Sequence, residues 1–210
     1  MKRLVVLLLC LLTIGAFADT EVLQPGPTEC CDSFVWQVNP DNNYNHYDHL
    51  DIGYFGGRYL SLIRFDELDD PLFDGCTVNE ATLALRPIDG SGWGSPPVDC
   101  YLHQITDAWE QDTVTWNTMP GYDAGSTVDF TYTTPSTWLL IDVTNIVTSW
   151  LEYGEENQGF FFAPAGTDYF GITFHSGEYG TASQRPALQV IYTPGSAVET
   201  VSWGVVKALE

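Results

Sequence analysis

One tryptophan lies in a segment whose composition leaves its ring free to stack on a ligand. Trp93 belongs to residues 89–97, which are rich in Gly, Ser and Pro and show no apolar periodicity that would bury an indole. Flat aromatic faces stack on the apolar face of a pyranose, while nearby amide, carboxylate or imidazole groups bond its hydroxyls. Trp93 is therefore the leading candidate for a ring that would stack on a sugar ligand.

Other aromatic side chains on loops or strand ends are weaker candidates for the same role. They are Tyr122, Tyr169, His175 and Tyr179. A second aromatic patch could comprise Tyr44, Tyr47 and Tyr54. The alternative for each tyrosine is that its ring caps the core while its hydroxyl stays in water.

Residues 41–51 are dense in oxygen donors that suit a hard cation. Asp41, Asn43 and Asn45 reproduce the alternating start of a calcium loop. His46 stands where an EF-hand has glycine, and no Glu closes the loop, so an EF-hand is excluded. The candidate cofactor is Ca²⁺ in a generic loop site, with zinc on His46 and His49, or a solvated Asn/Asp turn, as the alternatives.

No arrangement of residues indicates catalysis. Glycoside hydrolysis needs two carboxyl groups roughly 5–10 Å apart across a cleft. The carboxylate pairs Glu110 with Asp112 and Glu155 with Glu156 are instead near neighbours in expected turns. The sequence also lacks a G-x-S-x-G elbow and an H-E-x-x-H helix. We predict a non-enzyme, with Tyr101 and His103 as the nearest approach to a polysaccharide lyase.

Composition and charge narrow the class of protein and of partner. The 210 residues are 44% hydrophobic, 14% aromatic and 17% charged, which favours an aromatic-rich β protein. Against 28 acidic side chains stand 7 basic ones, for a net charge of -21. This excess repels phosphate backbones and anionic lipid, so nucleic acid and membrane surfaces are poor partners.

The first 18 residues have the pattern of a secretory signal peptide. Lys2 and Arg3 precede an apolar run, and Ala16 and Ala18 form a cleavage site, so the mature chain is expected to begin at Asp19. No other stretch approaches the roughly 20 apolar residues of a membrane span. Export predicts a secreted, extracellular or cell-surface protein, whose net charge changes from -21 to -23 when both basic residues are removed.

Four cysteines remain after export, an even number in an oxidising compartment. They are Cys30, Cys31, Cys76 and Cys100. Two disulfide bonds are therefore expected. Adjacent cysteines pair badly with each other, so Cys30 and Cys31 would each bond to Cys76 or Cys100, and both connectivities stay open.

Turn residues recur between short apolar runs, which predicts an all-β sandwich of about ten strands. The expected strands are 34–38, 49–54, 59–65, 81–87, 98–105, 127–132, 138–141, 159–163, 171–175 and 187–192. One segment, residues 142–154, instead has helical periodicity, with Asp142 as the cap and Gly154 at the end. Its apolar face, including Trp150, should close one end of the sandwich.

The expected organisation is a single domain with two tails. After the signal peptide come an N-terminal extension at 19–31, the domain at 32–194 and a C-terminal tail at 195–210. The tail has an apolar, aromatic stripe and contains Lys207, the only lysine of the mature chain. It could dock on a cell-surface component or on another copy, or fold back on the sandwich.

Several motifs, in order along the chain, resemble the DNRLRE domain, which is also classified as carbohydrate-binding module family 96. The motifs are 63–66, 81–85, Trp109 to Pro120, 142–144 with Trp150, 157–159, Ser176 and 185–188. The resemblance implies an antiparallel jelly-roll sandwich in secreted or surface-attached proteins. For some members it also implies binding of acidic or neutral polysaccharide without catalysis. Within the motifs, Trp109 and Asn117 are interpreted as structural, an anchored ring and a turn amide.

Two functions of different classes follow from these observations. The first is a secreted, non-catalytic polysaccharide-binding module. The second is a structural or adhesive subunit of an extracellular surface or filament, which assembles through its tails.

Overall fold

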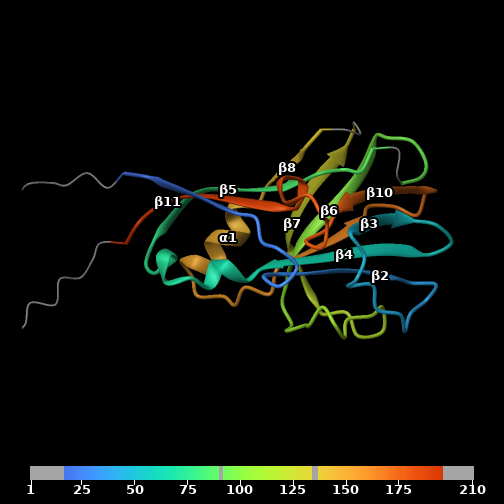
Figure 1. Cartoon of the computed structure of the whole chain (residues 1–210), viewed down its shortest axis with the longest axis horizontal. Coiled ribbons are helices and arrows are strands. Elements are labelled where there is room, and N and C mark those ends of the chain that lie inside the picture. The colour runs from blue at the N-terminus through green and yellow to red at the C-terminus, as the bar shows by residue number, and fades with distance from the viewer. Residues whose placement is uncertain (1–16, 90–91, 134–136, 196–210) are drawn as a thin grey trace, which may run out of the picture.

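The computed structural model describes residues 17–89, 92–133 and 137–195. These residues form a β-sandwich of two antiparallel sheets with one α-helix (Figure 1), which confirms the predicted fold class. Three short 3-10 helices lie in the connections: η1 (Asp66–Asp69), η2 (Pro71–Phe73) and η3 (Ala182–Gln184). No helix in the described ranges is long and apolar enough to cross a membrane.

The strands divide into a small and a large sheet. The small sheet has the order β1 (Asp19–Leu23), β11 (Ala187–Thr193), β5 (Thr77–Leu85), β8 (Leu139–Asp142). The large sheet has the order β10 (Phe170–His175), β3 (His49–Tyr54), β4 (Arg58–Phe65), β9 (Phe160–Pro164), β6 (Val98–Ile105), β7 (Tyr122–Tyr132), and β2 (Cys30–Trp36) pairs with β4. The observed bounds of β3 and β6 equal the predicted ones.

The N-terminal extension was expected to precede the first strand, and this expectation is wrong. Residues 19–23 form β1, in which Asp19 pairs with Tyr192 and Leu23 with Leu188 of β11. A short polar strand such as DTEVL has little apolar pattern that would reveal it in the sequence. It forms because pairing with β11 satisfies its backbone groups. The predicted signal peptide and C-terminal tail fall mostly on residues 1–16 and 196–210, outside the described residues.

Strands β4 and β9 are buried on both faces. Ile63 and Phe160 belong to the main core between the sheets, whereas Leu62 and Phe161 belong to a second apolar cluster on the other face. Successive side chains of a strand point to opposite faces, so two-sided burial requires a continuous apolar run. The runs Leu60 to Phe65 and Phe160 to Phe162 are therefore almost uninterrupted.

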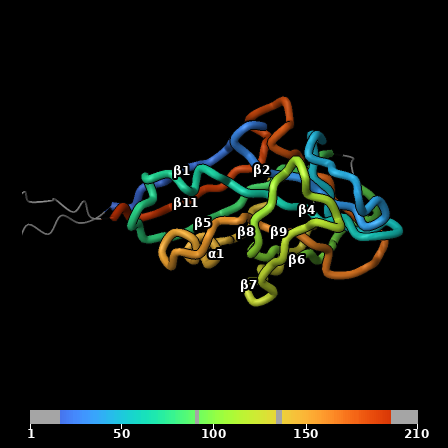
Figure 2. The backbone as a smooth tube through the Cα atoms, turned by 90° about the horizontal axis from the view of Figure 1, so that it is seen from below, coloured from blue at the N-terminus to red at the C-terminus, as the bar shows by residue number. Residues whose placement is uncertain are grey.

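The second apolar cluster is covered by the segment that joins β6 to β7. Trp109 and Val114 of this segment are buried there, and the Trp109 indole Nε1 donates to the Gln158 carbonyl at 2.8 Å. Asn117 Nδ2 donates to Asp41 Oδ1 at 2.8 Å. Figure 2 shows the segment in yellow-green, crossing in front of β4 and β9. The contacts agree with a structural role for Trp109 and Asn117.

Helix α1 (Thr144–Leu151) lies within the segment 142–154 whose periodicity predicted a helix, and it packs on β5 of the small sheet. Ile146, Val147 and Trp150 are buried, and the Trp150 ring lies 5.0 Å from that of Phe160. Asp142 Oδ1 accepts hydrogen bonds from the Thr144 hydroxyl at 2.6 Å and from the Thr144 N–H at 2.9 Å, which lower the pKa of Asp142. The N-cap residue is Val143, which makes no side-chain capping bond, so the prediction of Asp142 as the cap is wrong by one residue.

The four cysteines are free and buried in the structure, so the prediction of two disulfides is corrected. Because successive side chains of a strand point to opposite faces, Cys30 and Cys31 of β2 lie on opposite faces of the large sheet. Cys30 lies in the main core with Cys76 and Cys100, whereas Cys31 lies in the second cluster. The sheet itself therefore separates Cys31 from both of its expected partners.

Asp32 is a buried carboxyl group that ties β2 to the turn after β10. Its Oδ2 accepts hydrogen bonds from the Gly177 N–H at 2.7 Å and from the Cys30 thiol at 3.3 Å. The Glu178 carboxyl group acts on the same carboxyl group through its negative charge. Burial, then the charge of Glu178, raises the pKa of Asp32 from 3.8 to about 8.

We expect the free energy of unfolding to fall as pH rises from about 4 towards 8. In this window the unfolded state loses the Asp32 proton while the folded state retains it, so deprotonation favours unfolding. About 1 kcal/mol of this penalty lowers Tm by roughly 2–4 °C. Asp32→Asn keeps an oxygen acceptor and removes the titration, so its Tm should depend less on pH between 4 and 8, as measured by calorimetry.

The matched control is Asp74→Asn, which removes one carboxylate from an exposed position. If both variants follow the wild-type pH profile, Asp32 does not carry the proton linkage.

Candidate functional site

A row of aromatic rings and glycines crosses the large sheet at one end. Trp93 pairs with Gly171 of β10, which pairs with Gly53 of β3. Gly53 pairs in turn with Tyr59 of β4, and Tyr59 with Trp36 of β2. We call these five residues the ring row. The Trp93 and Tyr59 ring centroids lie 5.0 Å apart edge to face, and Tyr59 stacks on Trp36 at 5.0 Å.

Trp93 is half-buried rather than free, which corrects the expectation of an exposed indole. Its Nε1 donates to the Tyr54 carbonyl at 2.9 Å. A Cβ on Gly171 would overlap the indole at Cε2 and Cζ2, so only glycine leaves room for the ring. The indole therefore has a fixed orientation, which lowers the conformational entropy that stacking on a ligand would cost.

Two strongly exposed rings extend the ring row towards solvent. Phe55 is 52% exposed and Tyr169 is 62% exposed. The Phe55 ring lies 6.3 Å from that of Trp93 and 5.7 Å from that of Tyr169. Tyr169 also lines a hollow of about 410 Å³, together with Asp99, Asp168 and Pro164. Through Tyr169 the exposed rings therefore adjoin a hollow that two carboxylates line.

The predicted second patch is partly joined to the ring row through Tyr59. Phe34 lies 6.2 Å from Tyr59, stacks on Tyr44 at 4.4 Å and meets Tyr47 edge to face at 5.6 Å. Tyr44 is buried and Tyr47 is exposed.

Burial, then the charge of Asp51, raises the pKa of Tyr59 to about 12, so its hydroxyl stays protonated.

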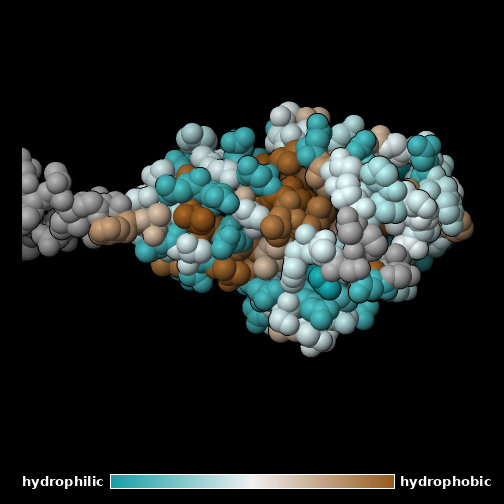
Figure 3. Space-filling model, turned by 90° about the horizontal axis from the view of Figure 1, so that it is seen from above, coloured by the Kyte–Doolittle hydropathy of each residue, from teal (hydrophilic) through white to brown (hydrophobic). Residues whose placement is uncertain are grey.

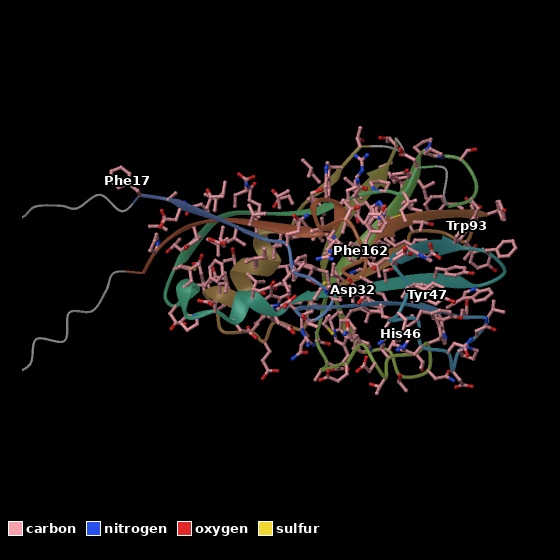
Figure 4. All side chains as sticks on the ribbon, in the orientation of Figure 1. Phe17, Asp32, His46, Tyr47, Trp93 and Phe162 are labelled. Atoms are coloured by element: carbon pink, nitrogen blue, oxygen red, sulfur yellow. The ribbon has the colours of Figure 1, made fainter. Side chains whose placement is uncertain are left out.

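The ring row lies far from the described chain ends. In Figure 4, Trp93 is at one end of the molecule, Phe17 is at the other, and Phe162 and Asp32 lie between them. On the face seen in Figure 3, hydrophobic residues gather near the middle, while the end away from the termini is white and teal.

The structure places Tyr122 at a different position, on the β6–β7 face. Its ring stacks on His103 at 4.7 Å and on Phe161 at 4.6 Å. Tyr101, also on β6, lies 6.1 Å from His103. Burial lowers the pKa of His103, so its imidazole is neutral at pH 7.

His175 and Tyr179 do not form part of an exposed site. His175 is buried, and its ring lies under that of Tyr179 at 3.5 Å. Burial lowers the pKa of His175. This pair lies at the end of β10 away from Gly171, so the two residues pack on the sandwich rather than join Trp93.

The predicted calcium ligands hold two loops together by hydrogen bonds. Asn43 Nδ2 donates to the carbonyls of Gln111 at 2.6 Å and Val114 at 2.7 Å, and Asn45 Nδ2 donates to Asp112 Oδ1 at 2.6 Å. Asp41 accepts from Asn117, as described above. Among the described residues, no three His, Cys, Asp or Glu side chains converge as a metal site. Calcium binding stays a prediction.

The carboxylates considered for catalysis also make structural contacts. Asp112 accepts from Asn45, and Glu155 Oε2 accepts from Gln104 Nε2 at 2.7 Å.

Sequence reasoning missed Trp36, Phe55 and Tyr59. Trp36 and Tyr59 lie in strands, where an aromatic residue is normally read from sequence as part of the core. Only the register of the paired strands places them beside Trp93. The signal that could have been used is the pair of glycines at 53 and 171, each inside an apolar strand, since an interior glycine often marks a close approach of another group.

Comparison with known proteins bears on the function of this surface. A family model described as "Carbohydrate-binding module family 96" matches residues 27–192. Two curated relatives are 25% identical over 177 residues: "tRNA nuclease WapA" of Bacillus subtilis (strain 168) and "tRNA(Glu)-specific nuclease WapA" of Bacillus subtilis subsp. natto (strain BEST195). Each match covers 77% of this chain but 7% of the relative.

The family match covers both sheets from β2 to β11, and it agrees with the motifs and the sandwich described above. The chain belongs to carbohydrate-binding module family 96.

Proposed function

We propose that this protein is a secreted, non-catalytic module that binds polysaccharide through the ring row and the adjoining hollow. Family membership suggests carbohydrate binding. The observation that carries the location is the contact chain from Trp36 through Tyr59 and Trp93 to the exposed rings of Phe55 and Tyr169. Rings fixed by packing and open on one side are suited to stacking on pyranose faces.

The charge distribution favours a neutral polysaccharide. The hollow is lined by Asp99 and Asp168, and no basic residue is among its described lining. Two of the four described arginines are engaged elsewhere: Arg64 donates to the Trp109 carbonyl and Arg185 to the Tyr179 carbonyl. Carboxylates accept hydrogen bonds from sugar hydroxyls, whereas they repel the carboxylates of a polyuronate.

The arrangement of the ends supports a module whose binding surface remains accessible. Strand β1 begins at Asp19, where signal cleavage is predicted, and pairs with β11. Both described ends therefore lie side by side, opposite Trp93 (Figure 4). Assembly into a surface layer or filament through the tails is the alternative function.

We expect Trp93→Ala and Tyr169→Ala each to weaken binding about tenfold, because one stacked ring contributes roughly 1–2 kcal/mol. Affinity gel electrophoresis in soluble xylan, glycol chitin, β-glucan and galactomannan measures this, with alginate and pectin as anionic comparisons. Tyr153→Ala is the matched control, since Tyr153 is 76% exposed and lies after α1, away from the ring row. Its mobility should equal that of the wild type.

Two outcomes would count against the proposal. Wild-type protein that no neutral polysaccharide retards would remove the proposed function. If Trp93→Ala and Tyr169→Ala are retarded as strongly as the wild type and Tyr153→Ala, the proposed site is wrong.

We expect Gly171→Ala to displace the Trp93 indole, because the new methyl group would occupy the position of the ring. Near-ultraviolet circular dichroism should change, and retardation should fall as it does for Trp93→Ala. Gly180→Ala is the matched control, since a Cβ there meets nothing within 4 Å. A Gly171→Ala variant with the wild-type spectrum would show that the indole has no fixed position.

A further inference from the structure

The face formed by β6 and β7 has the composition of a second stacking surface. Asp99, Tyr101 and His103 alternate along β6 and therefore point to the same side. Their register neighbours on β7 include Thr131 beside Asp99 and Asp129 beside Tyr101. Rings, carboxylates and a hydroxyl thus share one strand face.

The two tyrosines of this face offer ring surface to solvent. Tyr101 is 36% exposed and Tyr122 is 44% exposed. Tyr122 lies nearly parallel to Phe161, with 15° between the ring planes. The Tyr122 ring is thus held in place by Phe161 and His103, while 44% of the residue remains exposed and available to a ligand.

Polar groups beside these rings are held in place and can bond hydroxyls. Asp99 Oδ1 accepts from the Thr131 hydroxyl at 2.7 Å, which fixes the carboxylate and leaves further lone pairs free to accept. The Thr127 hydroxyl and His103 Nδ1 lie 3.0 Å apart. Asp129 is exposed beside Tyr101.

Asp99 connects this face to the hollow at Tyr169. It lines the hollow, and it stands two residues before Tyr101 on the same strand face, roughly 7 Å away. The exposed groups therefore run in sequence from Tyr169 through Asp99 and Tyr101 to Tyr122.

We propose that the β6–β7 face, through Tyr101 and Tyr122, is a second subsite for the polysaccharide that binds at the hollow. This inference rests on the proposed function. One glycan chain lies along β6 and contacts both subsites, so the protein binds internal stretches of a chain rather than chain ends. Affinity then increases with chain length, since a second contact made by the same chain is intramolecular.

The test compares Tyr101→Ala, Tyr122→Ala and Tyr153→Ala in affinity gels of xylan, glycol chitin, β-glucan and galactomannan, and by titration with the matching di- and hexasaccharides. We expect the first two variants to bind polysaccharide and hexasaccharide about tenfold more weakly than the wild type. Their affinity for the disaccharide, which reaches only the hollow, should be unchanged. Tyr153→Ala should behave as the wild type.

Because Tyr122 packs on Phe161, its replacement could disturb folding, and Tyr101→Ala provides the independent variant. Tyr122→Phe keeps the ring and should retain binding if stacking is the contact. Wild-type protein that binds none of the four glycans overturns the proposed function and this inference together. If Tyr169→Ala weakens binding while Tyr101→Ala and Tyr122→Ala do not, the second subsite is overturned and the proposed function stands.

Discussion

The burial of β4 and β9 on both faces is the constraint on which the rest of the structure depends. A sandwich needs apolar residues on only one face of each sheet, yet here Leu62 and Phe161 form a second cluster behind the main core. That cluster must be covered, and the segment between β6 and β7 covers it with Trp109 and Val114. Each buried aromatic side chain contributes roughly 1.5–3 kcal/mol, so this cover stabilises the fold as well as completing it.

The segment between β6 and β7 also determines which part of this sheet face remains exposed. The segment from β6 to β7 and the loop before β3 are fastened together by Asn43 and Asn45, which donate to the Gln111 carbonyl and to Asp112. Oxygen-rich loops can bind a cation, but here the amide nitrogens donate to partly buried acceptors and so join the two loops. Beyond the cover, Tyr101 and Tyr122 remain exposed, and the ring row occupies the far end of the sheet.

Glycine and tryptophan have complementary roles at that end. The Trp93 indole occupies the space that a Cβ of Gly171 would need, and its Nε1 is bonded to the Tyr54 carbonyl. A ring held this way loses little conformational freedom when a sugar stacks on it. In a chain with 28 acidic and 7 basic residues, neutral ring faces also provide contacts that the surrounding negative charge does not oppose.

The sequence by itself determined the sandwich, the bounds of β3 and β6, the presence of the helix and the family, because these depend on local periodicity and motif order. It also predicted Trp93 and Tyr169 as binding residues, and their binding stays a prediction. Only the tertiary structure decided which rings meet: strand register brings Tyr59 and Trp36 to Trp93, and burial withdraws His175. Alternation across a sheet likewise separates Cys31 from Cys76 and Cys100. Such outcomes depend on residues distant in sequence, and a single strand does not specify the partner with which it pairs.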